Sequence, residues 1–201
     1  SQQIGYGAMT KEHPGILFIH RNAHPRYFGG IERKIISIIA ELVAQYGIRC
    51  HVLTNHDESP LASGAREAGA SVHTHDMAGV RGFVGAVRHA LRIVASEDID
   101  LLQSHMFWGS LIAGTTRRFR PGLRHLFRIH THIEGSTISS LKRRAYHLCD
   151  FINSPGVDHY CVLSNTLRDE LTTASKISPT KVSVLLNGIP QPAPPHDIQD
   201  D

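Results

Sequence analysis

Histidine is the most unusual chemistry-bearing residue type in this sequence, with 15 among 201 residues. Two pairs have the spacing His-x-His, at His73/His75 and at His130/His132. Because residues i and i+2 of a β-strand share a face, each pair could present two imidazoles side by side. Neutral imidazoles bind zinc or copper. No HExxH motif occurs and no cysteine lies close to either pair, so isolated polar histidines are favoured and no metal is expected.

A glycine pair, Gly29-Gly30, is the second candidate site, within the segment RNAHPRYFGGIERK. It directly precedes an isoleucine-rich segment whose spacing predicts a helix over 31–46. The N–H groups and dipole of a helix amino terminus favour a phosphate or pyrophosphate, and glycine allows it to approach closely. A tight strand-to-helix turn explains the same two glycines, so both interpretations stay open at this point.

Several common catalytic motifs are absent from the sequence. No GxGxxG follows the first predicted strand and no GxxxxGK[ST] occurs, so neither an NAD-binding Rossmann unit nor a P-loop nucleotidase is predicted. No GxSxG motif indicates a serine nucleophile.

Strand and helix patterns alternate from residue 15 to about residue 186. The β-rich runs that we predict as strands are 16–20, 50–54, 71–75, 100–105, 124–130, 159–164 and 181–186. Between them, apolar residues three and four apart predict amphipathic helices. The clearest two stripes are Ile31, Ile35, Ile38, Ile39, Leu42 and Tyr46, and Val80, Phe83, Val84, Val87, Leu91 and Val94. The alternation predicts a doubly wound α/β domain with a mostly parallel sheet of about seven strands. Ligands of such folds bind at the carboxyl ends of the strands, where several of the histidines fall.

Composition excludes several classes of protein. The chain is 41% hydrophobic and 19% charged, which is typical of a globular domain, and a net charge of +3 does not indicate a nucleic-acid-binding domain. No apolar run of membrane-spanning length and no signal-peptide pattern occurs, so a cytoplasmic location is predicted. The three cysteines have no CxxC spacing and are expected to be reduced and buried.

Charge and proline are unevenly distributed along the chain. The basic residues of the middle segment are Arg117, Arg118, Arg120, Arg124, Arg128, Lys142, Arg143 and Arg144. A solvated face is the favoured explanation for them. Four prolines within 190–195 predict an extended interdomain linker over 189–201, and residues 1–14 are expected to be a flexible segment. A linker that leads to no further domain suggests a truncated chain.

A series of motifs in a fixed order resembles the amino-terminal, acceptor-side domain of a GT-B-fold retaining glycosyltransferase of family 4. The motifs are FGGIER, IDLLQSH, FRIHTH, VDHYCVLSNTLRDEL and KISPTKVSVLLNGIP. The resemblance covers roughly residues 15–190, and it implies a Rossmann-like half of a GT-B fold over residues 15–188. Its specificity comes from the order of the motifs, since each of them alone is weak.

The resemblance implies a nucleotide-diphosphate sugar as donor, a saccharide or lipid-linked hydroxyl as acceptor, transfer of a hexose with retention, and no cofactor. His130 matches the cleft histidine that contacts the transferred sugar, and His132 is the competing candidate. Gly29 and Gly30 match the glycines that approach the donor diphosphate. The further cleft residues that it implies are Glu32, His105 and Thr131.

The sequence also departs from the family pattern. Gln103 stands where the pattern has the first histidine of an H-x-H, which leaves the acceptor contacts open. The donor-binding C-terminal domain is absent from the sequence, so the chain alone is predicted to be inactive and to need that domain as its partner. A non-catalytic acceptor-binding subunit of a split transferase and half of a GT-B-fold sugar-nucleotide epimerase are the alternatives. The basic segment is also compatible with docking on anionic headgroups at the inner face of a membrane.

Overall fold

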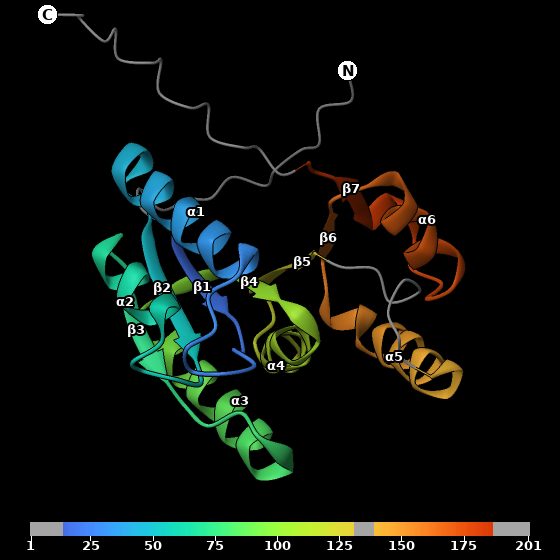
Figure 1. Ribbon diagram of the computed structural model, residues 1–201, viewed down its shortest axis with the longest axis horizontal. Coiled ribbons are helices and arrows are strands. Elements are labelled where there is room, and N and C mark those ends of the chain that lie inside the picture. Colours follow the sequence, from blue (N-terminus) through green and yellow to red (C-terminus); the bar gives the residue numbers. More distant parts are fainter. Residues whose placement is uncertain (1–13, 131–138, 187–201) are drawn as a thin grey trace, which may run out of the picture.

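The computed structural model describes residues 14–130 and 139–186, and it contains one sheet with helices on both faces (Figure 1). The strands are β1 (Gly15–Ile19), β2 (Arg49–Thr54), β3 (Ser71–Thr74), β4 (Ile99–His105), β5 (Arg124–Ile129), β6 (His159–Val162) and β7 (Val182–Val184). Every pairing is parallel, in the order β3-β2-β1-β4-β5-β6-β7. The predicted doubly wound α/β fold is confirmed.

The helices pack on the sheet in two layers. They are α1 (Gly30–Tyr46), α2 (Pro60–Glu67), α3 (Gly79–Ser96), α4 (Met106–Phe119), α5 (Ser140–Asn153) and α6 (Asn165–Thr173), with short 3₁₀ turns η1 (Ser154–Gly156) and η2 (Pro179–Lys181). Alternate residues of β1 point to opposite faces. Ile16 and Phe18 pack with residues of α1 and α2, whereas Leu17 and Ile19 pack with residues of α3 and α4. A strand buried on both faces explains why β1 reads as a continuous apolar run.

The sheet reverses its strand order between β1 and β4, which are neighbours although they are far apart in sequence. From β1 the chain passes through α1 to β2 on one side, and from β4 it passes through α4 to β5 on the other. The loops that leave these two strands therefore diverge and open a crevice at the carboxyl edge of the sheet. His20 follows β1 and His105 ends β4, so both lie at this edge.

The predicted apolar stripes of the two long helices are only partly correct. Tyr46, in the last turn of α1, is 61% exposed, and Val80 and Val84 of α3 are exposed as well. In α3, the small residues Gly82 and Ala86 are buried instead and allow the helix to approach the core closely. The sequence pattern overestimated burial because it weights large apolar side chains and gives little weight to small residues.

Two further expectations need correction. Cys50 is buried as predicted, but Cys149 and Cys161 are only half-buried; all three thiols are free. The basic segment does not form one solvated face, because Arg117 makes an ion pair with Asp158 at 3.2 Å and Arg128 is buried. In the part of the chain that the structure describes, no helix is both long and apolar enough to cross a membrane.

Gly109 marks the closest approach of α4 to β1. A Cβ at this position would lie 2.6 Å from the carbonyl oxygen of Ile19, which is a backbone atom and cannot rotate away. Helix propensity alone predicts that Gly109→Ala raises the free energy of unfolding by about 1 kcal/mol. Overpacking costs about 1–3 kcal/mol or more, and here it acts against backbone.

We therefore expect Gly109→Ala to lower the free energy of unfolding by about 1–2 kcal/mol, measured by urea denaturation. Gly30→Ala is the matched control, because a Cβ at Gly30 meets no atom within 4 Å. If Gly109→Ala is as stable as the control variant, the close packing of α4 on β1 is wrong.

Candidate functional site

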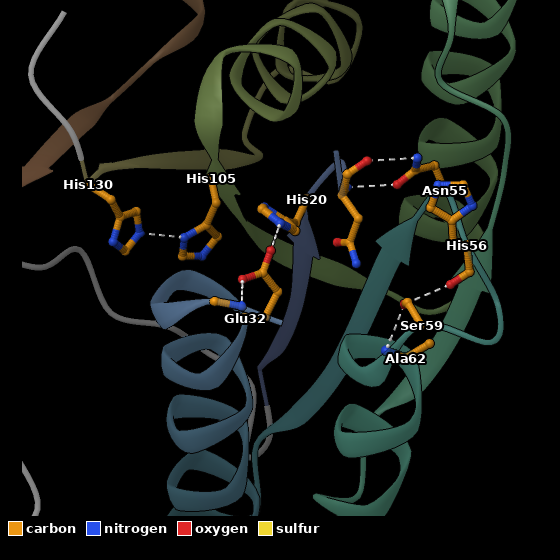
Figure 2. Close-up of polar contacts among 10 residues, drawn as sticks. His20, Glu32, Asn55, His56, Ser59, Ala62, His105 and His130 are labelled. Carbon is orange, nitrogen blue, oxygen red and sulfur yellow. Dashed lines mark hydrogen bonds and ion pairs between the residues drawn. The ribbon is translucent and has the colours of Figure 1, made fainter. Parts of the chain in front are cut away.

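Glu32 connects the end of β1 to the start of α1. Its Oε1 lies 3.0 Å from Nε2 of His20, and its Oε2 accepts a hydrogen bond from the Gly29 N–H at 2.9 Å (Figure 2). Both side chains of the His20–Glu32 pair are only 3% exposed. The bond to Gly29 is the reciprocal half of a capping box, in which the third helical residue reaches back to the residue before the helix. Glu32 thus fixes the loop from β1 against the helix.

The carboxyl group of Glu32 is ionised in this position. Burial alone would raise its pKa, but hydrogen bonds from His20 and from the backbone N–H groups of Glu32 and Gly29, with the charge of His20, hold the pKa below its usual value. A negative charge in the first turn is also favoured by the helix dipole. Both oxygens are engaged inside the protein, so the structure assigns Glu32 a positioning function; direct contact with donor or acceptor stays a prediction.

The two glycines at the start of α1 differ in their surroundings. Gly29 has an ordinary φ of −103°, so the backbone there does not require glycine. A Cβ on Gly29 would meet the ring of Tyr27, whereas a Cβ on Gly30 would meet nothing within 4 Å. The first N–H groups of a helix have no partner within the helix. Of the two explanations for the glycine pair, room for a ligand beside Gly30 is therefore better supported than a turn that requires glycine.

Three histidines form a row across the carboxyl edge of β1, β4 and β5. Nδ1 of His105 lies 2.9 Å from Nε2 of His130, which directly follows β5 (Figure 2). The ring of His20 meets the ring of His105 edge-on, with centroids 6.2 Å apart. His105 is fully buried and His130 is half-exposed. The row therefore links the amino terminus of α1, through His20 and Glu32, to an accessible imidazole at His130.

Both members of the His105–His130 pair are neutral at neutral pH. Burial lowers the pKa of His105 well below its usual value, and the nearby His130 and His20 lower it further. Burial, with the positive charge of Arg128, lowers the pKa of His130 to about 4. A neutral imidazole has one N–H donor and one acceptor nitrogen, so His130 is equipped to hydrogen-bond a hydroxyl or phosphate oxygen.

The turn between β4 and α4 is unusually sharp. Met106, the first residue of α4, has a φ of 61°, a left-handed conformation that is rare for a residue other than glycine or asparagine. His105 is the last residue of β4 and also the residue that precedes the helix. Left-handed backbone of this kind costs about 1–3 kcal/mol and persists where the surrounding structure imposes it. At this turn the left-handed Met106 directly follows the end of β4, and the His105 side chain is fully buried.

The remaining sequence candidates lie elsewhere. Thr131 and His132 fall outside the described residues, so the choice between His130 and His132 stays a prediction. His73 is hydrogen-bonded to His51 at 3.3 Å, and the ring of His75 stacks on His89. These rings come from β2, β3, the residue directly after β3 and α3, and they are not part of the row described above.

The His-x-His pairs are the sequence features that could hold a metal ion. Within residues 14–130 and 139–186, no group of three or more His, Cys, Asp or Glu side chains is arranged to hold a metal ion. The expectation that the protein needs no metal stays a prediction, and elemental analysis of the purified protein tests it.

Sequence analysis missed two features of the site. The His20–Glu32 pair was detectable in part, because Glu32 stands three residues after Gly29, at the capping-box spacing. Asn22 and Asn55 also join the loops after β1 and β2: the Asn22 N–H donates to Asn55 Oδ1 at 2.8 Å, and Asn55 Nδ2 donates to the Asn22 carbonyl at 3.1 Å (Figure 2). No sequence signal indicated this reciprocal contact.

Comparisons with known proteins identify the family. The sequence model described as Glycosyltransferase Family 4 matches residues 28–191, which is well over half of the chain. The chain belongs to glycosyltransferase family 4. A search of curated proteins finds no match. The family assignment thus rests on the sequence model, and it agrees with the resemblance inferred from the motifs.

Solved structures show the same fold at low sequence identity. A glycosyltransferase from Rickettsia africae ESF-5 superposes with a TM-score of 0.65 at 15% identity, over 89% of this chain and 44% of that one. The lipopolysaccharide outer core galactosyltransferase WaaB gives 0.66 at 16% identity, over 87% and 46%. A UDP-N-acetylglucosamine 2-epimerase gives 0.60 at 12% identity, over 86% and 48%. The chain therefore spans less than half the length of these structures.

His125 is the second residue of β5, and its ring joins β4, β5 and η1. Its Nε2 accepts a hydrogen bond from the Ser104 hydroxyl at 2.7 Å, and its Nδ1–H donates to the Gly156 carbonyl at 2.7 Å. Burial lowers the pKa of His125 to about 4, from a value of 6.5 for an unburied histidine. The unfolded chain therefore binds more protons than the folded chain between these two pH values, and stability falls as the pH is lowered through this window.

We expect His125 to account for about 3 kcal/mol of the stability lost between neutral pH and pH 4. His125→Gln removes the titrating group, so its free energy of unfolding should depend less on pH by that amount, although the variant is less stable at neutral pH. Urea denaturation of both proteins at several pH values measures the difference. Equal pH slopes for the two proteins would refute the assignment.

Proposed function

We propose that this chain is the acceptor-binding N-terminal domain of a glycosyltransferase that moves a hexose from a nucleotide-diphosphate sugar to a hydroxyl of a saccharide or lipid-linked acceptor, with retention. The observation that carries the proposal is the row of contacts from the amino terminus of α1 to His130. The row brings a helix amino terminus, which is suited to an anion, and the neutral imidazole of His130 to the same edge of the sheet. The chain that contains it is a member of glycosyltransferase family 4.

The two ends of this row suit two parts of the donor. The N–H groups at the start of α1, with open space beside Gly30, are suited to the negative diphosphate. His130 is suited to a hydroxyl of the transferred sugar, where a donated hydrogen bond stabilises charge that develops in the transition state. Since His130 is neutral at neutral pH, it supplies this hydrogen bond without adding a full positive charge.

Retention is proposed from the chemistry available at this edge. The bond between the sugar carbon and the diphosphate oxygen breaks, a bond to the acceptor oxygen forms on the same face, and the acceptor proton passes to the released diphosphate. This route needs no carboxylate base from the protein. The Glu32 carboxylate is occupied by His20 and Gly29, which supports a route in which it takes no proton.

A partner domain is part of the proposal. The chain spans less than half of the transferases that it resembles in fold, and we propose that a C-terminal donor-binding domain holds the nucleotide opposite the carboxyl edge of this sheet. The domain alone would then bind acceptor but transfer no sugar.

The test uses the complete enzyme, in which this chain is joined to its donor-binding domain. A panel of nucleotide-diphosphate sugars is supplied with and without candidate acceptors, and released nucleoside diphosphate and the anomeric configuration of the product are measured. Acceptor-dependent release with a retained configuration is expected. Epimerised donor in the absence of acceptor would favour the epimerase, and acceptor binding without turnover would favour a non-catalytic subunit; either result overturns the proposal.

We also propose that α5 touches an anionic membrane surface during catalysis. Its exposed apolar side chains are Leu141, Leu148, Phe151 and Ile152. Arg144 on the same helix and Lys176 after α6 are exposed next to them, which is the combination that binds anionic headgroups. The protein should sediment with anionic vesicles at low salt and not with neutral ones, and Phe151→Glu should weaken sedimentation. No sedimentation with anionic vesicles removes this part of the proposal.

A further inference from the structure

Gln103 lies directly behind the His105–His130 pair. Its Nε2 is 3.2 Å from Nε2 of His105, and both residues are buried, Gln103 at 6% exposure and His105 at 0%. An amide nitrogen donates hydrogen bonds and does not accept them. Nε2 of His105 is therefore the acceptor of this bond and carries no proton.

This contact determines the proton positions in both imidazoles. A neutral His105 with a bare Nε2 carries its proton on Nδ1, which faces Nε2 of His130 at 2.9 Å. Nδ1–H of His105 then donates to His130, whose Nε2 is the acceptor. A neutral His130 with an occupied Nε2 has its proton on Nδ1. Within residues 14–130 and 139–186, the hydrogen bond described for the His130 ring involves Nε2, and the side chain is half-exposed.

We propose that Gln103 is a positioning residue that sets the tautomers of His105 and His130, so that His130 offers an N–H donor, and not a basic lone pair, to the bound ligand. The ligand group that fits Nδ1–H is an oxygen with a free lone pair, either a hydroxyl oxygen of the sugar or an oxygen of the diphosphate. Only the identity of this ligand rests on the proposed function. The tautomers follow from contacts within the chain alone.

The consequence for the chemistry is that His130 does not act as a general base. Its Nε2 is occupied by His105, and its Nδ1 already carries a proton. Burial and the charge of Arg128 keep the ring from taking a second proton until the pH approaches 4. His130 is thus a fixed donor over the whole neutral pH range, whereas a histidine base would lose activity as the pH falls through its pKa.

NMR of the protein labelled with ¹⁵N-histidine reads the tautomers directly, because protonated and bare ring nitrogens have well-separated shifts. The signals of His105 and His130 are assigned by their loss in His105→Asn and His130→Asn. In the unsubstituted protein at neutral pH, both rings are expected to have a protonated Nδ1 and a bare Nε2. A protonated Nε2 on His130 would overturn the proposal, since it means that Gln103 presents its oxygen to His105.

Two substitutions of Gln103 separate positioning from packing. Gln103→Met keeps the length of the side chain and removes the donor, so a second tautomer of His130 should become populated. Gln103→His retains a ring N–H donor and should restore the single tautomer. If Gln103→Met folds and keeps one pure Nδ1–H tautomer on His130, Gln103 does not control it. If that variant does not fold, the signals of the unsubstituted protein still decide the proposal.

Activity of the complete enzyme provides an independent readout. Gln103→Met is expected to lower kcat by about tenfold with little change in the KM for acceptor, because the donor at His130 is present in only part of the molecules. The pH profile of kcat should show no acidic limb caused by His130 above about pH 5. An enzyme without transferase activity would refute the proposed function and leave the NMR result intact, so the two failures are distinguishable.

Discussion

Replacing His130 with alanine in the complete enzyme is expected to lower kcat by about 10²-fold or more. His130 Nδ1–H is the donor that we assign to the transferred sugar, and alanine removes it without blocking the crevice. The loss should fall on kcat and on kcat/KM alike, because a hydrogen bond that strengthens in the transition state contributes little to substrate binding. Steady-state kinetics with saturating acceptor measures both quantities.

The control for this variant is His159→Ala. His159 begins β6 at the opposite, amino edge of the sheet, and its ring makes one side-chain hydrogen bond, to Ser183 at 2.7 Å. Its removal should leave kcat within about twofold of the unsubstituted enzyme. His130→Ala also leaves Nδ1–H of His105 without its partner, so a stability loss of about 1–2 kcal/mol is expected and is measured separately. Near-normal turnover by a folded His130→Ala enzyme would refute the role of His130.

Gly30→Val is expected to raise the KM or Kd for the nucleotide-diphosphate sugar by about tenfold or more, a cost of about 1.4 kcal/mol per factor of ten. The open space beside Gly30 is where we place the diphosphate, and the branched side chain would fill it. Because no atom lies within 4 Å of a Cβ at this position, the substitution should leave the fold intact. Donor titration by calorimetry measures the change.

Side-chain size provides the internal control at this position. Gly30→Ala should weaken donor binding less than Gly30→Val does, while both variants unfold at the same urea concentration or higher than the unsubstituted protein. Binding of acceptor alone should stay unchanged in both variants. If donor affinity is insensitive to the size of residue 30, the diphosphate does not lie at the start of α1.

The architecture was largely predictable from the sequence. Every predicted strand was confirmed within a few residues, because short, largely apolar runs between amphipathic helices have few other solutions in a chain of this length. The expected position of the candidate site also came from that topology, since His105 ends β4 and His130 directly follows β5, its neighbour in the parallel sheet. The strand ends were less well predicted: β6 and β7 stop at Val162 and Val184, two residues before their expected ends.

The contacts within the site were not predictable in the same way. Gln103 looked like a departure from a family pattern, and only the tertiary structure shows its amide nitrogen 3.2 Å from His105. The occupation of both Glu32 oxygens likewise depends on where His20, which directly follows β1, lies against the start of α1. Which atom faces which neighbour is set by packing between elements distant in sequence, and periodicity within one element carries no information about it.

The most direct test of the account is a crystal structure of the complete enzyme with an unreactive analogue of its nucleotide-diphosphate sugar. We predict that the diphosphate lies against the N–H groups at the start of α1, beside Gly30, and that an oxygen of the sugar lies within hydrogen-bonding distance of Nδ1 of His130. An analogue bound elsewhere, with the carboxyl edge between β1 and β5 unoccupied, would contradict the central claim.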